Sequence, residues 1–141
     1  IPGPVELVEA SSMPTSTDMP RVDELLESVR DFLRNDARKA LEGRNAFLSL
    51  VASNSLDIVL RELMLTPAHL SAEEARLREL LDSDASLESL RNTLALGLRD
   101  GSIALDHPGL SDHLRATVVN QLAIDQPKYS GLAAALKVDR P

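Results

Sequence analysis

Four residues in the second half of the chain have side chains whose types could bind a metal ion together: Asp106, His107, Asp112 and His113. Imidazole and carboxylate groups are common ligands of zinc and other transition metals. A metal site on one helix, however, usually places its two histidines at i and i+4, on a shared face. His107 and His113 are spaced i, i+6, and a Pro-Gly pair separates them. We therefore expect no metal site, and we expect Asp112 to support the start of a helix.

Other catalytic constellations are missing from the sequence. The chain has 0 cysteines, which excludes cysteine nucleophiles, disulfides and zinc–thiolate sites. Its 6 glycines are scattered and form no phosphate-binding loop, and no GxSxG nucleophile motif is present. With 1 Tyr, 2 Phe and 0 Trp, little is left for stacking a base or a flavin. We expect a protein that is not an enzyme and that holds no cofactor.

The charge balance excludes further classes of function. The net charge is −7, and no basic stripe of the kind that binds nucleic acid or an anionic membrane is present. No apolar run approaches the roughly 20 residues that a membrane-spanning helix needs. The first residues lack the basic and apolar regions of a signal peptide. We expect a cytoplasmic protein that binds neither nucleic acid nor membranes.

The segment that we expect to matter most for binding a partner or ligand is GRNAFLSLVASNSLDIVLRELML, residues 43–65. At helical spacing it is apolar on two faces, which predicts a central helix packed against several neighbours. Asn54 interrupts one apolar stripe, and Arg61 lies beside the same stripe. If buried, Asn54 must find hydrogen-bond partners. Two readings stay open: Asn54 and Arg61 satisfy the ends of neighbouring helices, or they reach a partner or ligand.

The remaining periodicity predicts an all-α fold, a single bundle of about five helices. Pro67 is expected to end the helix of residues 43–65, because proline disfavours helical backbone at the preceding residue. Ser71 and Glu74 form a capping box, which predicts a new helix start. Inward faces are expected at Leu87, Leu90, Leu94 and Leu98, and at Leu114, Val118 and Leu122. The predicted helices cover residues 22–41, 43–65, 72–81 and 87–99, and a last one from 111 to before Pro127.

The two ends of the chain are expected to lie outside the helical bundle. Residues 1–20 are rich in proline, serine and threonine, which predicts an extended tail or a partner-binding arm. Its natural anchors are Val5, Leu7 and Val8. The bundle domain is expected over residues 21–130. Residues 131–141 are expected to form a C-terminal tail that adds at most one loose helical turn.

Three blocks of the sequence resemble a family of small bacterial helical proteins of unknown function. The first is ELL…VR.FL, the second is GR..F...VA.N.L.I..REL, and the third is HLR.TV..QLA.D.PKY. In this chain they fall within residues 24–33, 43–63 and 113–129, and the resemblance covers roughly residues 20–130.

This resemblance implies a biological setting. Members of the family look like partners of kinases related to aminoglycoside phosphotransferases, and they are associated with acyl-CoA dehydrogenases. Those kinases are thought to phosphorylate hydroxyacyl-CoA in fatty-acid and hydroxy-acid breakdown. The resemblance therefore implies a non-catalytic accessory subunit of such a kinase, with acyl-CoA as a further ligand at the shared interface.

On this reading, Arg44, Asn54 and Arg61 are the expected polar contacts to the kinase, because arginine can clamp a carboxylate or phosphate. Asp125 and Tyr129 are expected to fix the adjacent corner. The alternative is a self-associating structural protein without a fixed kinase client. Excess apolar surface, with Leu60 and Met64 expected on an outer face, fits a homo-oligomer equally well.

Overall fold

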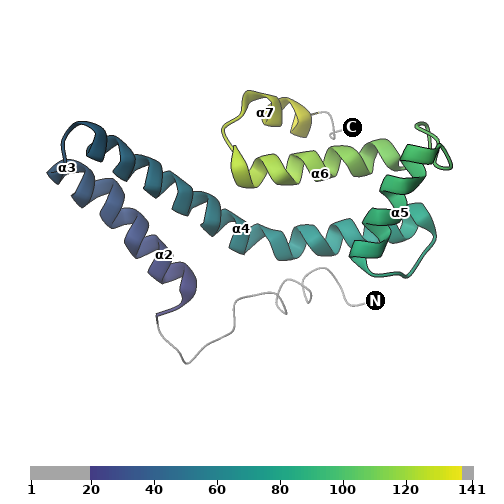
Figure 1. The fold of residues 1–141 in the computed structure, drawn as a ribbon, viewed down its shortest axis with the longest axis horizontal. Coiled ribbons are helices and arrows are strands. Elements are labelled where there is room, and N and C mark those ends of the chain that lie inside the picture. The colour runs from purple at the N-terminus through teal and green to yellow at the C-terminus, as the bar shows by residue number, and fades with distance from the viewer. Residues whose placement is uncertain (1–19, 138–141) are drawn as a thin grey trace. The chain divides into compact units, whose positions relative to one another are not determined.

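The computed structural model describes residues 20–137, so the expected anchors Val5, Leu7 and Val8 lie outside the described residues. Within the described part there is no β-strand, and the predicted all-α class is confirmed. The helical elements, shown in Figure 1, are α2 (Val22–Asp31), η1 (Phe32–Ala37), α3 (Arg38–Ala40), α4 (Gly43–Leu81), α5 (Leu87–Asp100), α6 (Leu110–Asp125) and α7 (Ser130–Lys137).

The longest element, α4, shows that the predicted helix break at Thr66-Pro67 is wrong. α4 continues for 39 residues with Pro67 inside it. Ser71, expected to cap a new helix, is an exposed residue in the middle of α4. A proline removes one backbone hydrogen bond and leaves the other bonds of the helix in place. The chain nevertheless divides into two compact units at this proline, one ending at Pro67 and the other beginning at Ala68.

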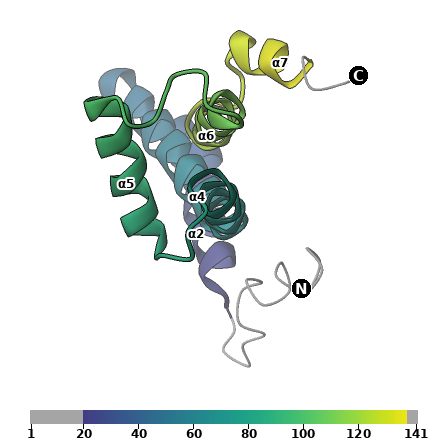
Figure 2. The same ribbon diagram turned by 90° about the vertical axis from the view of Figure 1, so that its right-hand side faces the viewer.

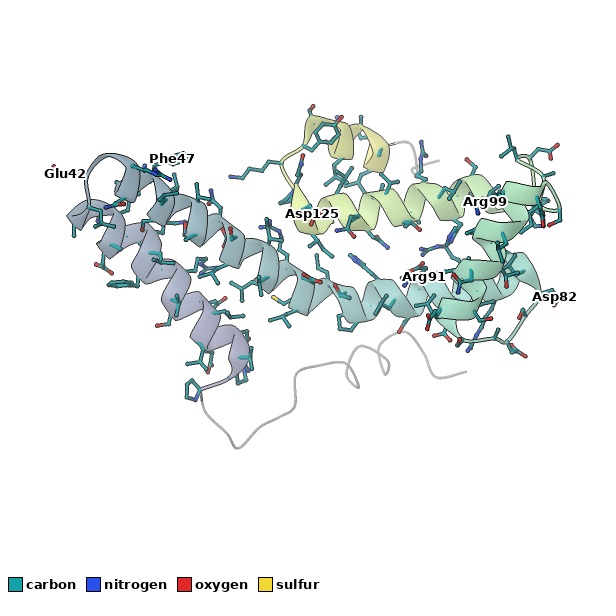
Figure 3. All side chains as sticks on the ribbon, in the orientation of Figure 1. Glu42, Phe47, Asp82, Arg91, Arg99 and Asp125 are labelled. Atoms are coloured by element: carbon teal, nitrogen blue, oxygen red, sulfur yellow. The ribbon has the colours of Figure 1, made fainter. Side chains whose placement is uncertain are left out.

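The first unit is a helical hairpin. Elements α2, η1 and α3 follow one another directly and run beside residues 43–67 of α4, with the reversal at Glu42 (Figures 1 and 3). η1 is a π-helical segment, in which the Arg38 N–H reaches back to the Leu33 carbonyl. Ser49 of α4 donates a second hydrogen bond to that carbonyl, with an Oγ–O distance of 2.6 Å. This hydrogen bond from Ser49 joins the π-helical segment η1 to α4.

The second unit has a small leucine core. Leu77 of α4, Leu90 and Leu94 of α5, and Leu110 at the start of α6 are buried against one another. Figure 2 shows α5 lying beside α4 in this unit. The predicted inward leucines of α5 are therefore confirmed. Gly101, with φ of +80°, ends α5 in the left-handed conformation that glycine adopts without strain, as the sequence predicts.

The expected inward face of α6 is wrong at Leu114 and Val118, whereas Leu122 is half-buried. Leu114 is 46% exposed and Val118 is 58% exposed. The residues of α6 that are buried are Leu110, His113 and Ile124. His113 is one of the buried residues of α6, so a prediction based only on the spacing of apolar residues does not find this inward face. α7 then adds eight helical residues where a single loose turn was expected, with Leu132 buried.

Candidate functional site

A polar cluster joins the two arms of the hairpin. Asp57 of α4 accepts a hydrogen bond from Arg30 Nη1 at 3.3 Å and a shorter one from Arg34. Arg34 also donates to the Asn54 side-chain oxygen at 3.2 Å. Burial opposes ionisation of Asp57, but the hydrogen bond and charge of Arg34, with the charge of Arg30, outweigh burial and lower the pKa of this carboxyl. This edge of the hairpin is held by ion pairs made within the chain.

The structure places the predicted contact residues in different settings. Asn54 is exposed and accepts a hydrogen bond from the Arg34 side chain of η1, a contact to a side chain and not to the backbone at a helix end. Arg61 is half-buried, and Arg44 is exposed beside the hairpin turn. Asp125 lies at the end of α6 (Figure 3), where it accepts a hydrogen bond from Gln121 at 2.8 Å. The roles of these residues in partner binding stay predictions.

Tyr129 packs on its own local structure. A Cβ placed on Gly131 would come within 2.3 Å of the Tyr129 ring, so the ring can lie this close to the backbone only because residue 131 is glycine. The Tyr129 side chain remains 52% exposed. It is an exposed aromatic side chain fixed at the junction of α6 and α7.

The opposite edge of the hairpin is apolar. Val22, Leu25 and Val29 of α2, with Phe32 at the start of η1, lie on one side of Arg30, about 80–160° around the helix axis by the rotation of about 100° per residue. On α4, Leu48, Val59 and Leu63 lie on the side away from Asp57 by the same rule. Because the arms are antiparallel and Arg30 meets Asp57 on one edge, these side chains fall together on the other edge. We call the following residues the apolar face: Val22, Leu25, Val29, Phe32, Leu48, Val59 and Leu63.

The apolar face is largely uncovered. Its exposed fractions run from 39% at Leu63 to 58% at Val22. α2, η1 and α3 contain no buried residue. Next to the face, a hollow of about 300 Å³ is lined by Val59, Glu62, Leu63, Thr66 and Pro67. Apolar residues that are scattered singly over a protein surface need no explanation, but these seven lie together in one patch.

This exposure corrects the expectation that residues 43–65 form a central helix packed on several sides. Phe47, labelled in Figure 3, is 64% exposed and Val51 is 41% exposed. Leu60, expected on an outer face, is only 5% exposed, whereas Met64 is 70% exposed. One arm covers one side of this half of α4, so much of its apolar circumference remains uncovered.

Sequence reasoning named Asn54 of the polar edge as a candidate but missed its arginine partners, and it missed the apolar edge. The spacing of the apolar residues of α2 predicts an apolar helix face, but it is the same whether that face meets a core or a partner. The ion-pair cluster had a visible signal, since Arg30 and Arg34 are spaced i, i+4 on one helix face and Asp57 is one of the two acidic residues of the apolar stretch, with Glu62.

Other kinds of site can be tested on the described residues. Within residues 20–137, no group of three or more histidine, aspartate or glutamate side chains is arranged to hold a metal ion. None of the helices in this range combines the length and the apolar character needed to cross a membrane.

Comparison with known proteins gives one result. The chain matches no curated protein and no solved structure. A family model, described as Domain of unknown function (DUF6285), matches residues 39–129, from the end of the first hairpin arm to Tyr129. Since that match spans more than half of the sequence, the chain belongs to the DUF6285 family.

Proposed function

We propose that this protein is a non-catalytic accessory subunit that binds another protein through the apolar face of its hairpin. The observation that carries the proposal is the exposure of seven apolar side chains on one edge of two adjacent helical arms. Full burial of a valine, leucine or phenylalanine stabilises a complex by about 1.5–3 kcal/mol, so covering these half-exposed side chains contributes about 1 kcal/mol each. The polar edge at Asp57 fixes the pairing of the arms, which keeps the face preorganised for binding.

The proposed client is a kinase related to aminoglycoside phosphotransferases, acting on hydroxyacyl-CoA in the cytoplasm. The support for this client is the resemblance of three sequence blocks to a family associated with such kinases. In this arrangement the accessory subunit supplies no reacting group. It stabilises the kinase or completes its acyl-CoA pocket, with Arg44 and Arg61 as candidate contacts to phosphate or carboxylate groups.

Co-purification of the chain with a kinase of this class, encoded beside it, tests the proposal. We expect a complex at micromolar concentrations, and expect the double variant Leu25→Lys/Val59→Lys to abolish it while remaining helical by circular dichroism. The matched control is Leu96→Lys, because Leu96 is an apolar side chain of α5 that is 59% exposed and lies in the other unit. No complex with the wild-type chain, or equal loss with Leu96→Lys, would contradict the proposal.

Self-association is the second candidate. Two hairpins that pair through their apolar faces would form a four-helix arrangement related by twofold symmetry, a common solution for helices with one apolar side. Light scattering of the isolated chain separates the two candidates. A wild-type dimer that Leu25→Lys/Val59→Lys converts to a monomer favours self-association. A wild-type monomer favours binding to the kinase.

A further inference from the structure

The unit that begins at Ala68 contains a second hollow, of about 460 Å³, within the range of about 300–1,000 Å³ that is typical of small-molecule pockets. α4 contributes Arg76 and Glu79 to its lining. The loop before α6 contributes His107 and Gly109, and the first turn of α6 contributes His113. Three chain segments therefore bring an arginine, two histidines and a helix N-terminus to one place.

Three nitrogen atoms of this lining are buried without a hydrogen-bond partner. They are Nε and Nη2 of Arg76 and Nδ1 of His113. His113 is only 4% exposed, and it lines the hollow together with Arg76. A buried donor left unpaired costs about 1–3 kcal/mol, and more when the donor is charged. The Arg76 nitrogens only donate, and His113 Nδ1 donates in one of its two tautomers, so both residues suit a hydrogen-bond acceptor in the hollow that they line.

The carboxylate of Glu73 does not fill this role. Glu73, one helical turn before Arg76, accepts hydrogen bonds from Arg91 at 2.8 and 2.6 Å, one on each carboxylate oxygen. Burial lowers the pKa of His69 and of His113, and the charge of Arg76 lowers both further. Glu73 opposes these effects at His113. His113 is thus a neutral imidazole near pH 7, able to donate through one ring nitrogen.

The start of α6 adds a further attraction for an anion. Gly109, with φ of +82°, is the N-cap of α6, and no side chain caps the helix. The first turn of a helix carries partial positive charge and free N–H groups. A small anionic group in the hollow would lie between this helix start and the Arg76 guanidinium.

From the unpaired Arg76 and His113 nitrogens in this hollow, we propose a binding site for the carboxylate group of a small molecule. One arginine and one neutral imidazole suit a single negative charge. Glu79 and Asp112 lie exposed at the rim and repel a doubly charged phosphate more strongly than a monoanion. The bound carboxylate accepts from Arg76 and from His113, and the remainder of the molecule extends past the rim. This site is independent of the hairpin face and of its client.

Imidazole NMR of the full chain tests the proposal, with acetate, butyrate and inorganic phosphate as probes. We expect saturable shifts of the His113 ring resonances with acetate and butyrate, and a weaker response to phosphate. Arg76→Gln should weaken carboxylate binding about 10- to 100-fold, as expected for loss of a charge-assisted hydrogen bond. The fold should survive, because the variant removes a side chain whose buried nitrogens have no partner.

Arg78→Gln is the matched control, since it makes the same charge change two positions further along α4, at a residue paired with Glu74 at 2.6 Å. It should leave carboxylate affinity unchanged. Absence of saturation with all three probes overturns the site. Equal weakening by Arg76→Gln and Arg78→Gln overturns the role of Arg76. Tighter binding of phosphate than of both carboxylates overturns the ligand class.

Discussion

The Arg91 guanidinium donates two hydrogen bonds to the Glu73 carboxylate, at 2.8 and 2.6 Å, and so joins α5 to α4. The Glu73 side chain is 13% exposed and the Arg91 side chain is 50% exposed (Figure 3 labels Arg91). The hydrogen bonds from Arg91 hold the pKa of Glu73 below its usual range against the opposing effect of burial. Because Glu73 is engaged in this way, the guanidinium of Arg76 keeps its unpaired nitrogens.

Arg91→Met should destabilise the protein by about 1–2 kcal/mol, because it leaves the half-buried Glu73 carboxylate without its two donors. Arg78→Met is the comparison, since Arg78 makes an exposed i, i+4 pair with Glu74 and such pairs contribute only about 0.3–0.5 kcal/mol. Urea unfolding of the two variants measures the difference. Equal destabilisation would contradict a special role for the Arg91–Glu73 pair.

The hairpin cluster should make stability depend on pH in the acid range. Asp57 has a folded-state pKa below its ordinary value of 3.8. Its contribution is therefore complete above about pH 4 and is lost as pH falls through the lowered pKa, because the unfolded chain takes up the proton first. Asp57→Asn should cost about 1 kcal/mol near neutral pH, and the two stability curves should converge in acid. A constant difference across the range would contradict this account.

Asp36→Asn provides the control for that measurement. Asp36 is an exposed aspartate of η1, so the substitution should change stability little at any pH. Thermal unfolding followed by circular dichroism at a series of pH values compares the three proteins directly.

The sequence was sufficient for the all-α class and for the C-terminal ends of α5 and α6, because Gly101 and Pro127 are local signals that end a helix. It was insufficient for α4, where Pro67 gives a local signal that the helical residues on both sides override. It was also insufficient for the sites. The residues that precede and follow Arg76 in the sequence do not mark it as a binding residue. Only the packing of α6 against α4 brings His113 close to it.

Pro67 offers a test of the continuous α4. A proline in a helix interior is about 3 kcal/mol less favourable than alanine, since it lacks an N–H and crowds the preceding turn. Pro67→Ala should therefore raise the free energy of unfolding, by up to that amount. Thr66→Ala, at the preceding position, should change it by only about half a kcal/mol or less. If Pro67→Ala instead lowers stability, the chain does not run through this residue as a regular helix.

His113 should produce a second, separate pH dependence. Burial, and then the charge of Arg76, lower its pKa from the ordinary value of 6.5, while Glu73 acts in the opposite direction. Well above pH 6.5 the imidazole is neutral in both states, so its protonation makes no contribution to stability. As pH falls below that value, the unfolded chain binds the proton before the folded chain does, so stability falls until the lowered pKa is passed.

His113→Gln should flatten this slope between about pH 7 and pH 5, above the range in which most carboxylates titrate. His69, whose pKa is also lowered by burial and by Arg76, remains in the variant and accounts for any residual slope. Denaturant unfolding at fixed pH values measures the slopes of both proteins. If the slope of stability against pH is unchanged in His113→Gln, the His113 side chain takes up its proton as easily in the folded chain as in the unfolded one. That result would contradict the description of His113 as a buried, unpaired imidazole.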